Sequence, residues 1–94
     1  MELEEFRKKY DEKLKKFGYQ FDASGDHGNW VVVNYINKKK NTLITITLDK
    51  KSNYIPLRLL VFEGTEIKKT YDLTIDELFN FLEKEGWWNE WRWF

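Results

Sequence analysis

The stretch Thr42–Asp49 reads Thr-Leu-Ile-Thr-Ile-Thr-Leu-Asp and alternates apolar and polar side chains almost without error. Ile44, Ile46 and Leu48 fall on one side of an extended chain, because successive side chains of a strand face opposite sides. Isoleucine and threonine also favour strands, since their branched Cβ atoms fit a pleated surface. This stretch therefore predicts a central antiparallel strand with a neighbour on each side.

Loop lengths predict how the neighbouring strands pair with Thr42–Asp49. A four-residue loop at 38–41 places three apolar residues of a strand at Trp30–Asn37 opposite its apolar side: Val31, Val33 and Tyr35. A four-residue loop at 50–53 does the same for a strand at 54–62: Ile55, Leu57 and Leu59. A slip of one residue would break both matches, so the sequence predicts a meander in this register.

Two further strands complete the predicted sheet. Residues 19–23 alternate and predict a first strand, which a loop at 24–29 joins to the second. A last strand at 66–73 follows a turn, and an unbroken register places Ile67 and Lys69 on its inward side. An inward lysine is typical of an edge strand, where its stem can reach solvent, so we expect this strand at an edge.

Hydrophobic spacing predicts a helix before the first strand and another after the last. At residues 2–17 the apolar side chains recur at steps of three and four, the period of an α-helix. Thr74 and Glu77 form a capping-box pattern that opens a second helix, and Gly86 is its expected stop. The prediction is an α+β fold in the order α-β-β-β-β-β-α, with both helices on one face of the five-stranded meander sheet.

Composition limits the classes of function. Residues 1–94 are predicted to form a single domain without a linker, and the 16 basic and 16 acidic side chains cancel, unlike those of a generic polyanion binder. The chain has no cysteine, which excludes thiolate chemistry and favours a reducing compartment; we expect a cytoplasmic protein. No apolar run approaches the roughly 20 residues of a membrane span, so no membrane partner is expected.

The second face of the predicted sheet also carries many apolar side chains. Two helices cover one face of such a sheet but not both, and soluble monomers seldom expose so large an apolar patch. We expect this face to be covered by the aromatic-rich tail at 87–94, by a second copy of the chain, or by a different protein. Because Trp, Tyr and Arg dominate interface energies, the candidate partner-binding residues are Trp30, Tyr54, Arg58, Phe62, Trp87, Trp88, Trp91, Arg92 and Trp93.

The segment 24–29, Ser-Gly-Asp-His-Gly-Asn, has the most varied chemical groups. Ser24, Asp26 and His27 invite a nucleophile interpretation, but neighbours in sequence seldom reach triad geometry and no oxyanion motif accompanies them. The segment lacks the Walker spacing, and a metal would find a single histidine in the chain. We interpret it as a flexible loop and predict no catalytic residue, metal or cofactor; an enzyme or small-ligand site here is one alternative.

Basic side chains offer a second alternative, a single-stranded nucleic-acid binder. The runs at 38–40 and 50–51 lie at opposite ends of the predicted meander, so they do not form one basic patch. Arg58 on the second sheet face lies near aromatic side chains, the pattern on which nucleic-acid bases stack. The salt dependence of any such binding would separate this alternative from protein binding.

The function expected from these features is that of a small non-enzymatic protein-binding module acting through its aromatic surface. Its general build, a short cysteine-free domain with such a surface and no recognisable site, resembles the small inhibitors and immunity proteins of phages and bacteria. The resemblance rests on this build and on no particular residue. It implies an inhibitor or immunity-type protein with a protein partner, and a homodimer is a further expectation.

Overall fold

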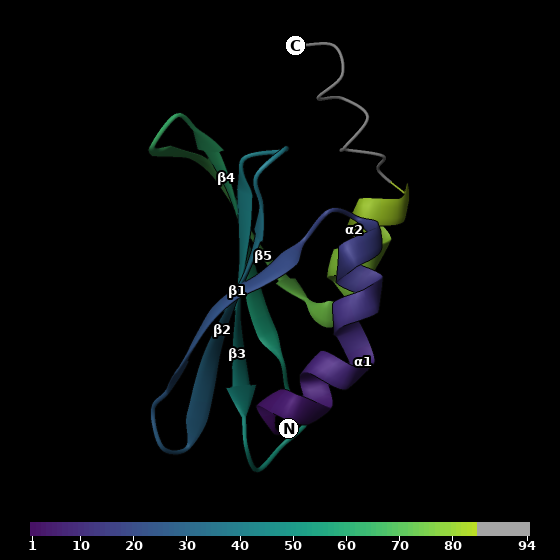
Figure 1. Ribbon diagram of the computed structural model, residues 1–94, viewed down its shortest axis with the longest axis vertical. Helices are drawn as coiled ribbons and strands as arrows, with labels where there is room; N and C mark the ends of the chain where they lie inside the picture. Colours follow the sequence, from purple (N-terminus) through teal and green to yellow (C-terminus); the bar gives the residue numbers. More distant parts are fainter. Residues whose placement is uncertain (85–94) are drawn as a thin grey trace.

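The computed structural model describes residues 1–84 of the chain. Two α-helices frame a run of five β-strands, in the order predicted from the sequence (Figure 1). The elements are α1 Leu3–Lys16, β1 Gln20–Asp26, β2 Trp30–Asn37, β3 Thr42–Asp49, β4 Pro56–Glu63, β5 Glu66–Thr74 and α2 Ile75–Lys84. The predicted helix stop at Gly86 and the tail at 87–94 lie outside the described residues.

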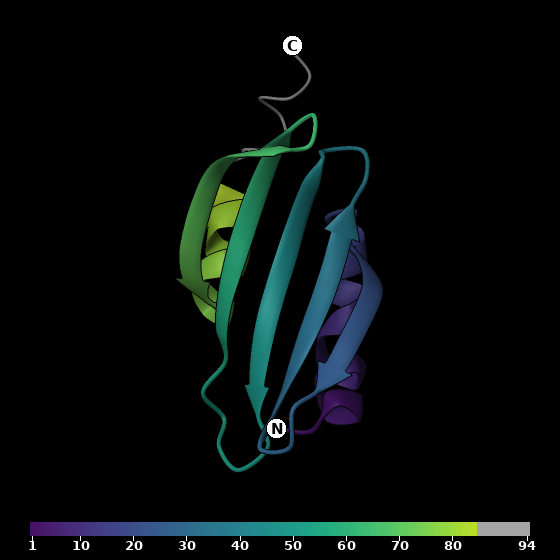
Figure 2. The same ribbon diagram turned by 90° about the vertical axis from the view of Figure 1, so that its left-hand side faces the viewer.

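The strands form one open antiparallel sheet in the order β1-β2-β3-β4-β5. Figure 1 shows α1 and α2 on the same side of this sheet, and in Figure 2 α1 lies behind β1 and β2 while α2 lies behind β4 and β5. We call the helix-covered side the inner face and the opposite side, which Figure 2 shows, the outer face. The α+β meander with both helices on one face is therefore confirmed.

The register predicted around β3 is confirmed along most of its length. β2 and β3 pair over all eight residues in the predicted register, and β4 follows in the predicted register with Leu57 opposite Ile46. The fourth strand was predicted to begin two residues too early, because β4 begins at Pro56. Proline has no N–H to extend the ladder, so Tyr54 and Ile55 stay outside the strand.

The pairing predicted for β5 is wrong for two reasons: the turn before the strand is one residue shorter than predicted, because Glu63 pairs with Glu66, and the strand contains a β-bulge. Phe62 pairs with Ile67 and Val61 with Lys69, so Lys68 is an extra residue in the ladder. An extra residue reverses the alternation beyond it, which places Ile67 on the outer face, where the residue is 57% exposed. Lys69 stays on the inner side, as predicted, opposite the buried Val61.

Strand β1 also departs from its prediction. Much of the segment 24–29, expected as a loop, pairs with β2 as far as Asp26 and leaves a two-residue turn that begins at Gly28. Gly28 has a φ of +87°, which suits the first position of a type II′ hairpin turn. Asp22 is an extra residue in this ladder and reverses the alternation predicted beyond Phe21.

The core lies between the inner face and the two helices. Both helices contribute fully buried side chains, Phe6 and Leu14 from α1 and Leu78 and Leu82 from α2. The helices reach the core through the apolar stripes that their spacing predicts. The sheet supplies the remaining side chains from the predicted inward sides of its strands, chiefly Val31, Val33, Tyr35, Ile44, Ile46, Leu48, Leu57 and Leu59.

Polar side chains buried near the β2–β3 hairpin are hydrogen-bonded. The Tyr19 hydroxyl lies 2.7 Å from Thr42 Oγ1, and Asn37 Nδ2 donates to the Phe17 carbonyl at 3.1 Å. Burial raises the pKa of the Tyr19 hydroxyl, which therefore keeps its proton. Gly18 has a φ of +91°, and a Cβ atom there would lie 2.9 Å from Asn37 Nδ2. These contacts hold the end of α1 against the hairpin.

Side-chain contacts also position the helices on the sheet. The predicted capping box is confirmed, because the Thr74 amide donates to Glu77 Oε1 at 2.8 Å and the Glu77 amide donates to Thr74 Oγ1 at 3.2 Å. In α1, Asp11 accepts hydrogen bonds from the Tyr35 hydroxyl and from Arg7 Nε, the latter at 2.9 Å. The Asp11 carboxylate thus ties α1 directly to β2.

Candidate protein-binding surface

No helix within residues 1–84 covers the outer face, since α1 and α2 both lie on the inner one (Figure 1). Strands β2, β3 and β4 alternate buried inward residues with more exposed outward ones. Their register sets the outward residues in rows that cross the strands. We call them the leucine row (Ile36, Leu43 and Leu60), the polar row (Asn34, Thr45 and Arg58) and the valine row (Val32 and Thr47).

Large apolar side chains are exposed at both ends of the outer face. Trp30 is 48% exposed and Tyr54 69% exposed at the end near the β3–β4 connection. Ile67 is exposed at the opposite end, beside its partner Phe62. Ile67 is absent from the predicted surface residues, because no residue around it signals the bulge that turns it outward. Together with the leucine row, these side chains form apolar patches at both ends of the outer face, on either side of the polar row.

The outer face is hollowed at each end. Trp30, Tyr54 and Pro56 line one hollow, and Phe62 lines the other together with Ile36 and Leu43 of the leucine row. Of the predicted partner-binding residues, the structure brings Trp30 and Tyr54 together at one end of the face. Phe62 lies at the other end, and Arg58 lies between the two hollows in the polar row.

The charge of Arg58 is balanced on the same face. Arg58 Nε donates to Asp72 Oδ1 at 2.7 Å, and this hydrogen bond raises the pKa of Arg58. Asp72 was not predicted to lie beside Arg58, because this pairing depends on the register of β5, which includes the bulge. Attraction of nucleic acids depends on unbalanced cations that displace counterions from phosphates. The ion pair therefore weakens the one feature that favoured a nucleic-acid surface.

Asp26 and His27, the candidate chemical groups of segment 24–29, contact their own hairpin. Asp26 Oδ1 accepts from the Gly28 amide at 2.9 Å, and Lys50 Nζ lies 3.0 Å from Asp26 Oδ2. These two hydrogen bonds, the backbone one foremost, lower the pKa of Asp26. The His27 ring stacks beside Trp30, with 6.5 Å between ring centres. Residues 1–84 contain no group of three His, Asp or Glu side chains placed to hold a metal ion.

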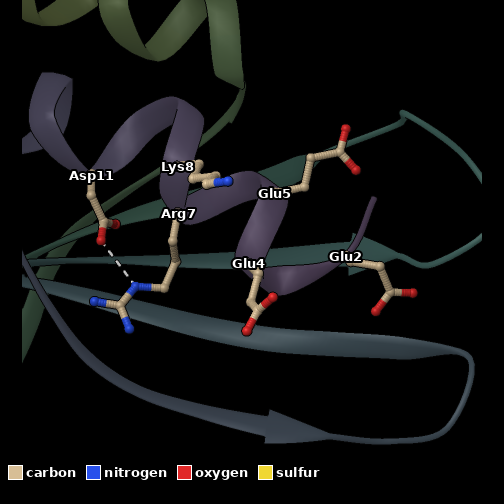
Figure 3. A pocket seen from close by; sticks show the side chains of 6 residues that line it. All are labelled: Glu2, Glu4, Glu5, Arg7, Lys8 and Asp11. Atoms are coloured by element: carbon tan, nitrogen blue, oxygen red, sulfur yellow. Dashed lines mark hydrogen bonds and ion pairs between the residues drawn. The ribbon is translucent and has the colours of Figure 1, made fainter.

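A further hollow lies over the first turns of α1 (Figure 3). Both signs of charge line it, and the ion pair drawn there joins Arg7 Nε and Asp11 Oδ2. The other lining side chains are exposed: Glu2, Glu4, Glu5 and Lys8. Mixed charges on an exposed helix surface are typical of a solvated face. This hollow therefore offers less support for a binding site than the outer face.

Two other predictions concern charge and the tail. The lysine runs at 38–40 and 50–51 lie at opposite ends of the sheet, as predicted, because one is in the β2–β3 hairpin and the other follows β3. The tail lies outside the described residues, so its partner-binding role stays a prediction. Its candidates are Trp87, Trp88, Trp91, Arg92 and Trp93.

Comparison with protein-family models, with curated proteins and with solved structures gives no match for this chain. Neither α1 nor α2, the helices of the described part of the chain, is long and apolar enough to cross a bilayer. The outer face, with its apolar rows and exposed aromatic side chains, is therefore the feature from which a function can be inferred.

Proposed function

We propose that this chain is a small non-enzymatic protein-binding module whose outer face receives a protein surface. The position of both helices carries this proposal, because they cover the inner face and leave the outer face uncovered within residues 1–84. Large apolar side chains gathered on an uncovered face of a soluble protein often mark a surface that binds something. The leucine row and three exposed large side chains lie on it, namely Trp30, Tyr54 and Ile67.

The partner surface should be broad and should combine apolar with polar side chains, because the apolar rows of the outer face lie on either side of the polar row. Trp30 and Tyr54 are the proposed anchors, since they line one hollow and aromatic side chains in pockets carry most interface energy. The predicted partner-binding residues of the tail at 87–94 extend the proposed surface. We propose an inhibitor or immunity-type role of phage or bacterial origin on the general build described above, and a cytoplasmic location on the absence of cysteine.

A pair of tyrosine substitutions tests the surface. The partner is first captured from the native host on the immobilised chain and identified by mass spectrometry, and its affinity is then measured for Tyr54→Ala and Tyr71→Ala. Tyr54→Ala should weaken binding by about 2 kcal/mol, roughly thirtyfold, as for an interface anchor. Its melting temperature should change little, because Tyr54 is mostly exposed.

Tyr71→Ala is the matched control on the inner side of the sheet. The Tyr71 ring lies 5.0 Å from the ring of Phe81, so its loss should lower the melting temperature. Binding measured well below that temperature should not change. The proposal fails if Tyr54→Ala, Trp30→Ala and Phe62→Ala all bind the partner with the affinity of the wild type.

A further inference from the structure

We infer that the outer face receives a second copy of this chain, packed sheet against sheet about a twofold axis that runs along β3. This inference rests on the proposed function and names the partner of the same surface. Three observations carry it: the order of side chains along the rows, the area of the sheet, and the bulges at both sheet edges.

The apolar rows match themselves under this symmetry. The twofold axis lies in the interface and runs parallel to β3. It places β3 of one copy on β3 of the other, and β2 of one copy on β4 of the other. Each row of one copy then meets the equivalent row of the second copy. Ile36 then faces Leu60 of the second copy, and Leu43 faces its own equivalent. At one end of the face, Trp30 meets the other copy's Tyr54, and both are exposed aromatic side chains.

The polar row decides between two possible axes. With the axis along β3, Arg58 faces Asn34 of the second copy, whose amide oxygen can accept a hydrogen bond from the guanidinium. With the axis across the strands through the polar row, Arg58 would face Arg58 and Asp72 would face Asp72. Like charges in opposition are destabilising. The axis along β3 opposes one like pair, Asp49 with Asp49, and this pair lies at the exposed end of the face and not at its centre. Two aligned sheets cross at about 30°, so side chains far from the centre of the interface are shifted from the partners named here. The contacts of the polar row, next to Thr45 at the centre, are shifted least.

The area of the face is sufficient for a dimer. Five strands spaced about 4.8 Å apart and eight residues long, at about 3.3 Å per residue, cover about 600 Å². Two copies would bury about twice that area, which is at the lower end of specific protein–protein interfaces. A reversible dimer with a dissociation constant on the order of micromolar is therefore expected.

The edges of the sheet are protected against self-association, whereas its outer face is not. Each edge strand carries a bulge, at Asp22 in β1 and at Lys68 in β5, and both extra residues are charged. Bulges and charges at sheet edges oppose edge-to-edge pairing. The leucine row on the outer face carries no charge. A second copy should accordingly dock on this face and not extend the sheet.

Sedimentation equilibrium of the full chain, from about 5 to 500 μM, measures the dimer, and two substitutions of Asn34 test its geometry. Asn34→Asp places a carboxylate opposite Arg58 of the second copy, twice per dimer, and should tighten association about fivefold. Asn34→Lys places like charges in opposition and should weaken association about tenfold. Within one chain, Asn34 and Arg58 lie two strands apart, about 10 Å, so direct effects on the monomer should be smaller.

Ser24→Lys is the control, because Ser24 is exposed on the inner side of edge strand β1 and should leave the dimer unchanged. Circular dichroism melts at low concentration verify that each variant is folded. The inference is overturned if the chain stays monomeric, or if Asn34→Asp and Asn34→Lys change association equally or not at all. A monomer whose Tyr54→Ala variant loses a captured protein partner would exclude the second copy while the proposed function stands. A monomer whose outer-face variants lose nothing would exclude both.

Discussion

Replacement of Ile46 by alanine should cost the fold more than most other single truncations. Ile46 is fully buried in the central strand, opposite Val33 on one side and Leu57 on the other. The substitution removes an ethyl and a methyl group, whose transfer from water contributes about 0.8 kcal/mol per carbon. The cavity between two neighbouring strands adds a further penalty, so the expected loss is about 3–4 kcal/mol. At about 4–8 °C per kcal/mol, the melting temperature should fall by about 12–32 °C.

Thr47→Ala is the matched control, because Thr47 is the next residue of β3 and lies on the outer face. It is only partly buried, so its truncation should cost less than about 1 kcal/mol through strand propensity and local contacts. Urea unfolding of both variants at low protein concentration measures the two losses independently of self-association. Equal losses from Ile46→Ala and Thr47→Ala would refute the assignment of inner and outer faces.

Two further predictions concern polar contacts. Thr42→Val should lower the free energy of unfolding in urea by about 1–3 kcal/mol, because it leaves the buried Tyr19 hydroxyl without its partner. The double variant Thr42→Val with Tyr19→Phe should recover much of that loss. No recovery would mean that the hydrogen bond is unimportant. The folded-state pKa of Asp26 is lowered, so its stabilising contribution is present above the ordinary carboxyl pKa of 3.8 and is lost as the pH falls through the lower folded value. The wild type should therefore unfold at a higher temperature than Asp26→Asn near neutral pH, and this advantage should shrink in melts below pH 3.8; an advantage independent of pH would contradict the assigned contacts.

The part of the fold that follows from hydrophobic alternation could be predicted from the sequence. In Thr42–Asp49 the inward residues after Thr42 are all apolar, and a shift of one residue would expose every one of them, so the register of β2 and β3 had a single solution. The capping box of Thr74 and Glu77 likewise depends on two residues at fixed spacing, and local hydrogen bonds are sufficient to form it.

The two bulges could not be predicted, because an inserted residue is determined by packing and not by a local pattern. Asp22 lies between Phe21 and Ala23, and Lys68 lies between Ile67 and a second lysine, so either residue could have continued the alternation. The consequences for the candidate surface are direct. The bulge in β5 turns Ile67 outward, and the β5 register places Asp72 beside Arg58. The sequence therefore predicted most of the outer face but not its extent at β5 or its charge balance.

Strand β2 gives the strongest sequence argument for a layer over the outer face. Its first residues are Trp30-Val31-Val32-Val33, apolar on both sides of the strand, and Ile36 continues the apolar outward side. Strands with one face in water alternate apolar and polar residues, whereas strands buried on both faces read as continuous apolar runs. Residues 1–84 cover only the inner side of β2 with helices. The outward side of this strand therefore has the composition of a buried face. Asn34 lies in the middle of that side, so a charged residue in its place should change the affinity for the surface that covers it.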